Sequence, residues 1–534
     1  MEPWNRAVDA LLPGRYNPAP MWTVLWWLFL FAAYTGVYEL LRYVLFRKAG
    51  LAFRRSAQEF VERHQVQIAR FQFANKLLVR QTLLNDPDIH AATAIHARDA
   101  HCSLEEARTR VETYVEEIVP AFNFISYYKI GYPLARLCIN TLYSAVVDRS
   151  EIERTRKVPE DAAVIYVLNH RSNFDFILAG YALSEQVALS YAVGEWARVW
   201  PLEELFKSFG SYFVRRNFRE PLYHLVLEKY VQLLTRKAGK QAIFIEGGLS
   251  RDGRFREPKI GLLDYVMKVK RDPGFQRDLV FIPAAINFDR VLEDTYLLGE
   301  KHGKAESRGF LQRVTSLGRV IAHVGATVAV NVYRYLTGTI LRHGYAAVCF
   351  GEPISLDAWL AGKDVMLSQL GDEERKGLVK NFAQHLMGRI GTVMPVTPVS
   401  LFARAFLDAG TDRVDRTQLM RRLRTLREAL IASGARVVAG KEFERAVRGR
   451  ATLADERALY QDDLFDVVDQ MFAADVAQQT VDVALDVLTQ RGLIRIEGDD
   501  LVLQPGGREI LEYYANAIEH LVQGLPPADS GGAR

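Results

Sequence analysis

The pattern of hydrophobic and polar positions changes twice along the chain. Residues 58–84 and 104–119 carry apolar side chains at helical spacing without Gly or Pro, so we expect a helical N-terminal region. From about residue 160, short apolar runs alternate with helical stretches. After residue 400 the helical spacing returns, and residues 492–496 and 499–503 predict a small hairpin.

The middle of the chain predicts an α/β layer. Four apolar runs have the length and composition of buried strands, and helical stretches separate them. The predicted strands are residues 162–168, 241–245, 279–285 and 346–350. The predicted helices are residues 176–183, 222–237 and 259–270. Strands that alternate with helices favour an α/β fold with a central, mostly parallel sheet flanked by helices.

These changes divide the 534 residues into five predicted segments. They are a membrane-anchoring segment (1–48), a helical N-terminal domain (49–150), an α/β domain (151–400), a helical C-terminal domain (401–525) and a disordered tail (526–534). Residues 304–342 interrupt the α/β order. Their apolar stretch, residues 320–336, is broken by polar side chains, which favours a helical insertion on the core over a second membrane-contacting element.

An uncharged apolar segment, residues 21–38, is the main membrane signal. Its 18 residues are close to the shortest length that spans a bilayer, and three tryptophans near its start suit a membrane interface. Seven Lys or Arg lie between residues 42 and 70, which predicts that the bulk of the chain is cytoplasmic. Spanning, interfacial and buried helices are all compatible with this length. We expect attachment to the cytoplasmic face of the cell inner membrane through residues 21–46.

Composition narrows the choice of partners. The chain has 68 Lys and Arg against 64 Asp and Glu, a weaker excess than nucleic-acid binders have, so we expect no nucleic-acid partner. A basic cluster between residues 413 and 427 is interpreted as a solvated helix face, or as a contact for anionic lipid or an acidic carrier protein. Three widely spaced cysteines predict reduced side chains, with no disulfide and no metal site.

Two titratable residues follow the predicted strand 162–168. His170 and Asp175 are five positions apart, so on a continuous helix their side chains would point about 140° apart. They can meet if His170 lies in the loop and Asp175 in the first helical turn, with Ser172 or Asn173 as the N-cap. The carboxylate then fixes the imidazole tautomer, and the other ring nitrogen can take a proton from an alcohol. A chance pair at this spacing is the competing interpretation.

Further clusters place cationic groups near predicted strand ends. Arg215 and Arg216 follow an apolar run, and their planar guanidinium groups match the geometry of phosphate oxygens. A surface ion pair is the alternative interpretation. Adjacent glycines after the strand 241–245 let backbone N–H groups approach an anion, although a plain turn is the alternative. That loop and the residues after it hold Glu246, Gly247, Gly248, Ser250, Arg251 and Lys259. Pro283 lies in the predicted strand 279–285. We interpret it as a core residue, and a residue that shapes the wall of a pocket is the alternative.

In this order the clusters closely resemble the four acyltransferase blocks of the glycerolipid acyltransferase superfamily. The matching residues are 170–175, 210–216, 246–251 and 282–283. The third block, with Glu246-Gly247-Gly248 before the serine and arginine, is similar to the bacterial and mitochondrial glycerol-3-phosphate branch. A looser likeness extends to residues 397–399 and 513–516.

The resemblance implies transfer of a fatty acyl group from acyl-CoA or acyl carrier protein to the sn-1 hydroxyl of glycerol-3-phosphate. The product is lysophosphatidate, in the first step of phospholipid synthesis. His170 is then the general base and Asp175 orients it. The implied substrate-binding residues are Arg171, Arg215, Arg216, Glu246, Gly247, Gly248, Ser250, Arg251, Lys259 and Pro283. Backbone donors near Gly247 or at the helix start are expected to stabilise the oxyanion. No cofactor and no metal are implied, and membrane lipid is an implied partner.

Two departures keep other acceptors open. Leu249 stands where that branch commonly has arginine, and Asn173 where it often has histidine. Dihydroxyacetone phosphate and lysophosphatidate are therefore alternative acceptors for the same chemistry. A catalytically silent, membrane-binding scaffold is the alternative of another class.

Overall fold

The computed structural model describes residues 76–122, 127, 131–148, 158–159, 161–183, 190–194, 202–215, 218–301, 330, 342–438, 480–523 and 525. These residues belong to one of the two units into which the chain divides, Val66–Arg534. The predicted membrane segment, Arg216, almost all of the insertion and the tail lie outside the described residues. Among the helices that are described, none combines the length and hydropathy needed to cross a bilayer.

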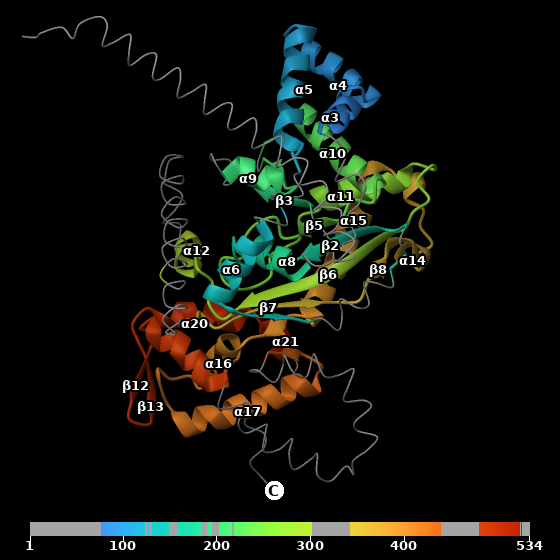
Figure 1. The fold of residues 1–534 in the computed structure, drawn as a ribbon. Coiled ribbons are helices and arrows are strands. Elements are labelled where there is room, and N and C mark those ends of the chain that lie inside the picture. The colour runs from blue at the N-terminus through green and yellow to red at the C-terminus, as the bar shows by residue number, and fades with distance from the viewer. Residues whose placement is uncertain are drawn as a thin grey trace, which may run out of the picture. The chain divides into compact units, whose positions relative to one another are not determined.

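Eight strands form the central sheet, in the order β1-β7-β6-β2-β5-β3-β4, with β8 also paired to β6 (Figure 1). Their bounds are β1 (Ser144–Val147), β2 (Ala163–Leu168), β3 (Ser190–Gly194), β4 (Tyr212–Val214), β5 (Gln241–Phe244), β6 (Leu279–Phe288), β7 (Tyr345–Phe350) and β8 (Ile354–Ser355). Only β7 and β8 run antiparallel to their neighbour β6 among these described strands. The prediction of a mostly parallel central sheet is confirmed.

All four strands predicted from the hydrophobic pattern are present. The pattern missed β1, β3, β4 and β8, which have two to five residues each. It also ended β6 three residues early, before Ile286, Asn287 and Phe288.

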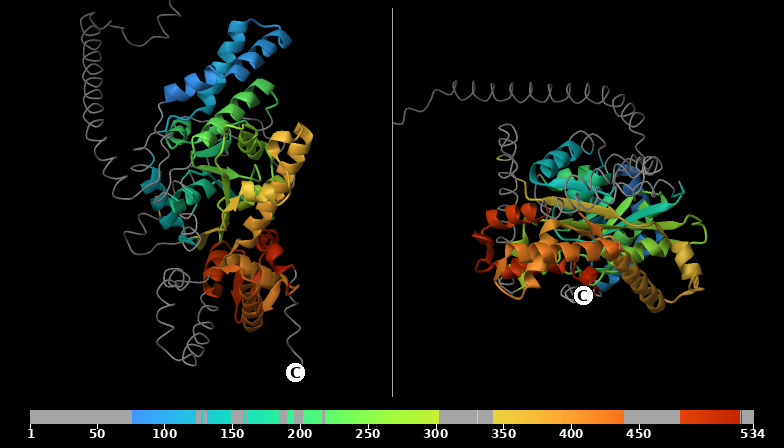
Figure 2. Two further views of the ribbon diagram at one scale, coloured as in Figure 1. Left: turned by 90° about the vertical axis from the view of Figure 1, so that its right-hand side faces the viewer. Right: turned by 90° about the horizontal axis from the view of Figure 1, so that it is seen from below.

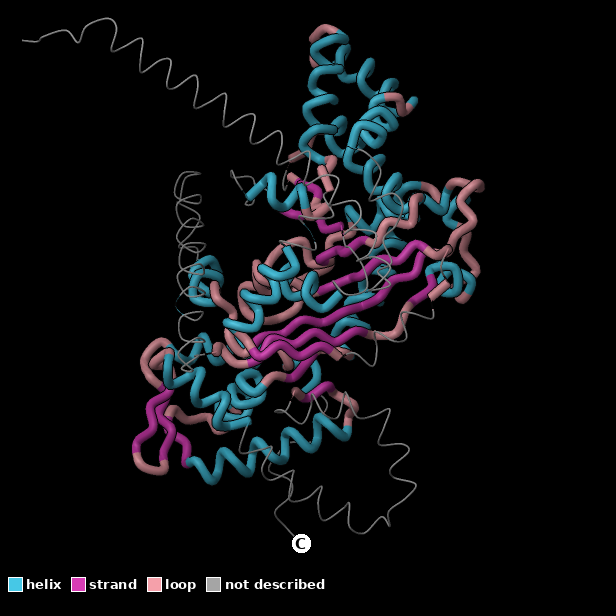
Figure 3. Tube along the Cα trace, viewed as in Figure 1, coloured by secondary structure: helices cyan, strands magenta, loops and turns pink. Residues whose placement is uncertain are grey.

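The two faces of the sheet bury alternate side chains. Along β2, Val164 and Tyr166 belong to one hydrophobic core, whereas Ile165 and Val167 belong to a second core on the other face. Helices cover both faces (Figures 2 and 3). The first core includes residues of α6 (Tyr132–Leu142), α8 (Asp175–Leu183), α9 (Leu202–Ser208), α12 (Asp294–Lys301), α16 (Pro398–Leu407), α17 (Arg416–Ala432) and α20 (Gly507–Asn516). The second includes residues of α3 (Lys76–Leu84), α4 (Pro87–Asp99), α5 (Leu104–Ile118), α10 (Pro221–Arg236), α11 (Gly261–Met267), α14 (Leu356–Ala361) and α15 (Asp372–Thr392).

The predicted hairpin near the C-terminus is confirmed and gains a third strand. β12 (Ile494–Glu497) pairs antiparallel with β13 (Asp500–Leu503), and β10 (Arg413–Asp415) joins the free side of β13. A separate pair joins β9 (Pro395–Val396) to β11 (Arg436–Val437). The helices after β9 contribute to the same core as the central sheet.

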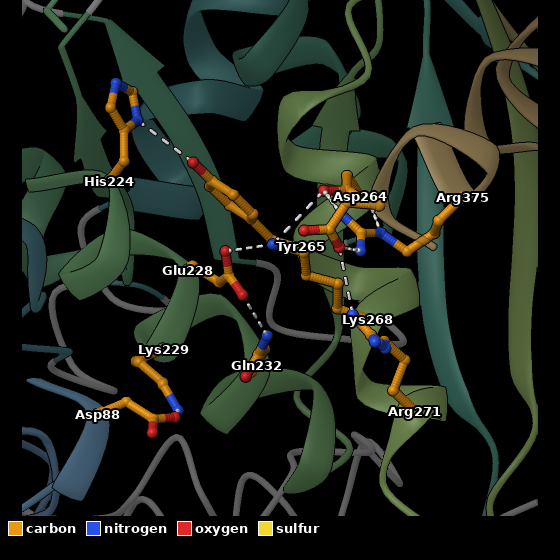
Figure 4. Close-up of polar contacts among 11 residues, drawn as sticks. Asp88, His224, Glu228, Lys229, Gln232, Asp264, Tyr265, Lys268, Arg271 and Arg375 are labelled. Atoms are coloured by element: carbon orange, nitrogen blue, oxygen red, sulfur yellow. Dashed lines mark hydrogen bonds and ion pairs between the residues drawn. The ribbon is translucent and has the colours of Figure 1, made fainter. Parts of the chain in front are cut away.

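A network of charged side chains ties together the helices of the second core (Figure 4). Lys268 Nζ lies 2.7 Å from Glu228 Oε2 of α10, and Arg375 Nε of α15 lies 2.9 Å from Asp264 Oδ1 of α11. Arg375 is almost fully buried, so its pairing with Asp264 offsets the cost of removing both charges from water. None of these residues was a predicted site residue, and we assign them to the scaffold.

Candidate active site

The first and third sequence clusters meet at the carboxyl ends of two neighbouring strands. β2 and β5 are parallel, with Leu168 opposite Phe244, and the chain leaves both strands at the same edge of the sheet. There the His170 N–H donates to Glu246 Oε1 at 2.8 Å, and the Ser250 N–H donates to the His170 carbonyl at 3.0 Å. This edge is where α/β proteins commonly bind ligands.

His170 and Asp175 lie as the loop-and-helix interpretation predicted. Asp175 is the first residue of α8 and is fully buried, and its Oδ2 lies 2.8 Å from His170 Nδ1. The imidazole also stacks on Phe244, with ring centroids 4.4 Å apart. The contact with the carboxylate assigns the ring proton to Nδ1 and leaves Nε2 as the acceptor.

The loop between β2 and α8 has its backbone donors already engaged. The five successive N–H groups of residues 170 to 174 each donate to a side-chain oxygen of the protein. The acceptors are Glu246, Asp175, Glu293 and Ser172. These N–H groups orient the loop, and the source of the oxyanion donors stays a prediction.

Glu293 is a site residue that the sequence interpretation missed. It directly precedes α12, and its carboxylate accepts from the Asn173 N–H and from Ser172 Oγ, the latter at 3.0 Å to Oε2. Burial raises the pKa of Glu293 to about 7. It belongs to no motif and lies 120 residues from its backbone donor, so no local signal could have revealed it.

Glu246, in the loop after the neighbouring strand β5, contacts the same region. Besides the His170 N–H, it accepts the Arg256 N–H at 2.8 Å, so it joins the two loops. Burial raises the pKa of Glu246 to about 7 as well, although both N–H donors and the charge of Arg171 oppose the shift. Burial therefore raises the pKa of two carboxyl groups that accept hydrogen bonds from the loop containing His170.

We expect the Glu293→Gln variant to gain stability relative to the parent protein as pH rises. Because the folded-state pKa of Glu293 is raised, its stabilising contribution is complete below its ordinary pKa and is lost as pH rises through about 7. The glutamine cannot ionise, so the difference in free energy of unfolding should shift toward the variant by roughly 1 kcal/mol or more between about pH 5 and about pH 8. Urea unfolding at several pH values measures this difference. Glu105→Gln, at an exposed position of α5, is the control. Parallel pH profiles for Glu293→Gln and the parent would contradict the expectation.

Arg171 has hydrogen-bonding capacity that the protein does not use. Its side chain is buried, and its Nη1 donates to the Gly253 carbonyl at 2.9 Å. Its Nε and Nη2 are also buried, yet neither has a hydrogen-bond partner among the described residues. Buried guanidinium N–H groups rarely remain without an acceptor, and a planar arginine fork suits phosphate oxygens. Arg171 is thus the predicted site residue with buried guanidinium donors that have no acceptor among the described residues.

The glycine-rich loop is tightly built. Gly247 has a φ of +63°, and a Cβ there would lie 2.7 Å from Lys259 Cγ, so a larger residue would be strained and crowded. Ser250 donates its hydroxyl proton to the Arg254 carbonyl at 2.6 Å, which closes the loop. Gly248 is buried, whereas Arg251 and Lys259 are exposed on the outside of this segment.

The structure does not bring every predicted residue to His170. Arg215 follows β4, two strands from β5, and its Nε donates to Glu117 Oε1 of α5 at 2.8 Å. This hydrogen bond raises the pKa of Arg215, and the guanidinium also faces the ring of Phe218. Pro283 is buried in β6 opposite Val167, between the parts of β6 that pair with β8 and with β7.

Comparisons with known families define the class of this chain. Residues 149–287 match the family described as Acyltransferase, and residues 330–468 match the Glycerol-3-phosphate acyltransferase C-terminal region. The first match contains the His170–Asp175 pair, Arg171 and the glycine-rich loop. The chain therefore carries an acyltransferase domain.

Its curated relatives share one name. A "Glycerol-3-phosphate acyltransferase" of Aeromonas hydrophila is 28% identical over 386 residues, which cover 70% of this chain and 45% of the relative. That of Actinobacillus succinogenes is 28% identical over 366 residues, covering 67% of this chain and 42% of the relative. The chain is thus a homologue of proteins named glycerol-3-phosphate acyltransferase, and it spans less than half the length of these two.

One solved structure also matches part of this chain. It is the 1-acyl-sn-glycerophosphate (LPA) acyltransferase of Thermotoga maritima, at 15% identity and a TM-score of 0.26. The match covers 59% of this chain and 98% of that one.

Proposed function

We propose that this protein transfers a fatty acyl group from acyl-CoA or acyl carrier protein to the sn-1 hydroxyl of glycerol-3-phosphate. The observation that carries the proposal is the buried His170–Asp175 pair next in sequence to Arg171, whose Nε and Nη2 have no hydrogen-bond partner among the described residues and suit a phosphate. A general base beside an anion site is what an acceptor with both a hydroxyl and a phosphate requires. The names of the relatives support the choice of acceptor.

In the proposed step, His170 Nε2 removes the proton from the acceptor hydroxyl while that oxygen attacks the thioester carbonyl. A C–O bond forms, and the C–S bond breaks when the tetrahedral intermediate collapses. The imidazolium returns the proton to the departing thiolate, so the histidine ends neutral. Asp175 holds the tautomer throughout and stabilises the imidazolium.

The acceptor's phosphate is assigned first to Arg171. The Nε and Nη2 donors of this arginine are buried, have no partner among the described residues and are held in one orientation. Arg216, Ser250, Arg251 and Lys259 are proposed as further ligands. Arg215 belongs in this group only if Glu117 releases it. Glu246 is proposed to brace the loop, since it accepts two backbone N–H groups. The backbone beside Gly247 is the proposed source of oxyanion donors, although the Gly247 N–H itself donates to the Phe244 carbonyl at 3.0 Å.

Membrane attachment through residues 21–46, at the cytoplasmic face of the inner membrane, is part of the proposal. The uncharged stretch 21–38 and the basic residues that follow it support this placement. An acyl chain held by a membrane-attached enzyme can stay in an apolar phase. Flotation of the full chain with liposomes, compared with a chain lacking residues 1–48, tests the attachment, and equal flotation of both proteins would refute it.

The function is tested by acyl transfer with the purified full chain in detergent. A C16 acyl-CoA and the matching acyl carrier protein are each offered with glycerol-3-phosphate, dihydroxyacetone phosphate or lysophosphatidate. We expect the highest kcat/KM with glycerol-3-phosphate and a product acylated at sn-1. Preference for either other acceptor would overturn the assignment of substrate. No transfer to any acceptor from either donor would favour the scaffold interpretation.

A further inference from the structure

The C-terminal helix α20 lies against the loop that carries the candidate site. Its residues fall outside both family matches, which end at residues 287 and 468. Gly253 has a φ of +85°, and a Cβ there would lie 1.8 Å from the Tyr513 carbonyl oxygen, so loop and helix touch through their backbones. Asn516 Nδ2 donates to the Asp252 carbonyl at 2.8 Å. Arg254 also forms an ion pair at 2.6 Å with Glu519 of the next helix, α21 (Glu519–Val522).

One residue of this helix covers the guanidinium of the site. The ring of Tyr513 lies under Arg171, with Cζ 5.3 Å from the ring centroid, and Tyr513 is fully buried. The Tyr513 hydroxyl also lies 3.5 Å from the Arg171 carbonyl. The Gly253 carbonyl accepts a hydrogen bond from Arg171 Nη1, and Gly253 itself packs against the backbone of Tyr513. The plane and rotation of Arg171 are therefore defined by α20, while Nε and Nη2, which have no hydrogen-bond partner among the described residues, can serve a ligand.

We infer that Tyr513 is a positioning residue for the phosphate of the acceptor, acting through Arg171, so that the C-terminal helix forms part of the acceptor site. The inference rests on the proposed function and goes beyond it by naming the element that prepares the site. A guanidinium that is already stacked and bonded loses less freedom when it binds an anion. Without the Tyr513 ring, Arg171 keeps its charge, but its side chain becomes ordered only when the ligand binds, which lowers the affinity for the ligand.

The adjacent residue provides a matched control. Tyr514 is also fully buried in α20, but its hydroxyl donates to Asp294 Oδ2 at 2.6 Å and accepts the Val291 N–H at 2.9 Å. Tyr513→Leu and Tyr514→Leu remove rings of equal size from the same helix. Only the first removes the surface under Arg171. Tyr513→Phe keeps that surface and loses only the hydroxyl.

The test measures binding and turnover separately on full-length protein in detergent. Calorimetry gives Kd for glycerol-3-phosphate and for inorganic phosphate, and steady-state kinetics give KM for acceptor and donor. For Tyr513→Leu we expect Kd for both anions and the acceptor KM to rise about tenfold, with donor KM unchanged, as the loss of a desolvated cation–π contact predicts. Tyr513→Phe should stay within about twofold of the parent, since the stacked ring remains. Tyr514→Leu should lower the thermal midpoint without this rise in Kd.

The outcomes separate the two proposals. Unchanged Kd in Tyr513→Leu, or an equal rise in Tyr514→Leu, would overturn the inference even if acyl transfer is confirmed. Anion binding that weakens only in Tyr513→Leu, in a protein that transfers no acyl group, would uphold the positioning role and overturn the proposed function. If Tyr513→Leu does not fold, Tyr513→Phe and Tyr513→Trp are measured in its place. The inference then requires both aromatic variants to keep the parent Kd, and a raised Kd in either would overturn it.

Discussion

Replacing His170 with alanine is expected to lower kcat by about 10³-fold, with little change in the KM of either substrate. In the proposed mechanism the imidazole accepts the hydroxyl proton, and the structure holds its Nδ1 against Asp175 and its ring against Phe244. The phosphate contacts assigned to Arg171 do not pass through the imidazole, so binding should survive. A loss confined to kcat is the signature of an interaction needed only in the transition state.

The measurement is steady-state acyl transfer by the variant and the parent at equal concentrations of folded protein. His385→Ala is the control, because His385 is exposed on α15, away from the residues assigned to the site. We expect the control to keep parental kcat. Turnover by His170→Ala at the rate of the control would remove this histidine from the mechanism.

The Asp175→Asn variant is expected to lose about 10³- to 10⁴-fold in kcat, by analogy with the same change in serine-protease triads. Asp175 Oδ2 takes the histidine Nδ1–H and the N–H groups of Arg171 and Ser172. An asparagine oxygen in the place of Oδ2 is a neutral and weaker acceptor for these three donors, and in the other amide orientation the NH₂ group faces Nδ1 and forces the ring proton onto Nε2. The ring nitrogen that faces the acceptor would then be a donor, and the imidazolium would lose its counter-charge.

Since Asp175 is fully buried, loss of folding must be separated from loss of chemistry. Circular dichroism and the thermal midpoint report folding, and phosphate binding reports whether Arg171 keeps its place. Asp486→Asn, on an exposed helix face, controls for the change in charge. A folded Asp175→Asn protein with parental kcat would exclude an orienting role. A folded protein that has lost phosphate binding would show that Asp175 mainly shapes the loop.

Much of the site could be predicted because its chemistry is local. His170 and Asp175 lie five residues apart, and a strand followed by a helix places one in the loop and the other in the first turn. Parallel pairing of β2 with β5 then brings Glu246 to the same edge as His170. The apolar runs that predicted these two strands also showed where each strand ends and its polar residues begin.

The sequence by itself determined the α/β class, the parallel strands at the centre of the sheet and the His170–Asp175 pair. Only the packing of distant elements shows the remaining partners. Glu293 accepts a hydrogen bond from the β2–α8 loop, Tyr513 lies under Arg171, and Glu117 pairs with Arg215. Local periodicity specifies the direction of a side chain within its own element. The partner of a buried charge depends on which elements pack against it, and for Arg171 that element lies 342 residues further along the chain.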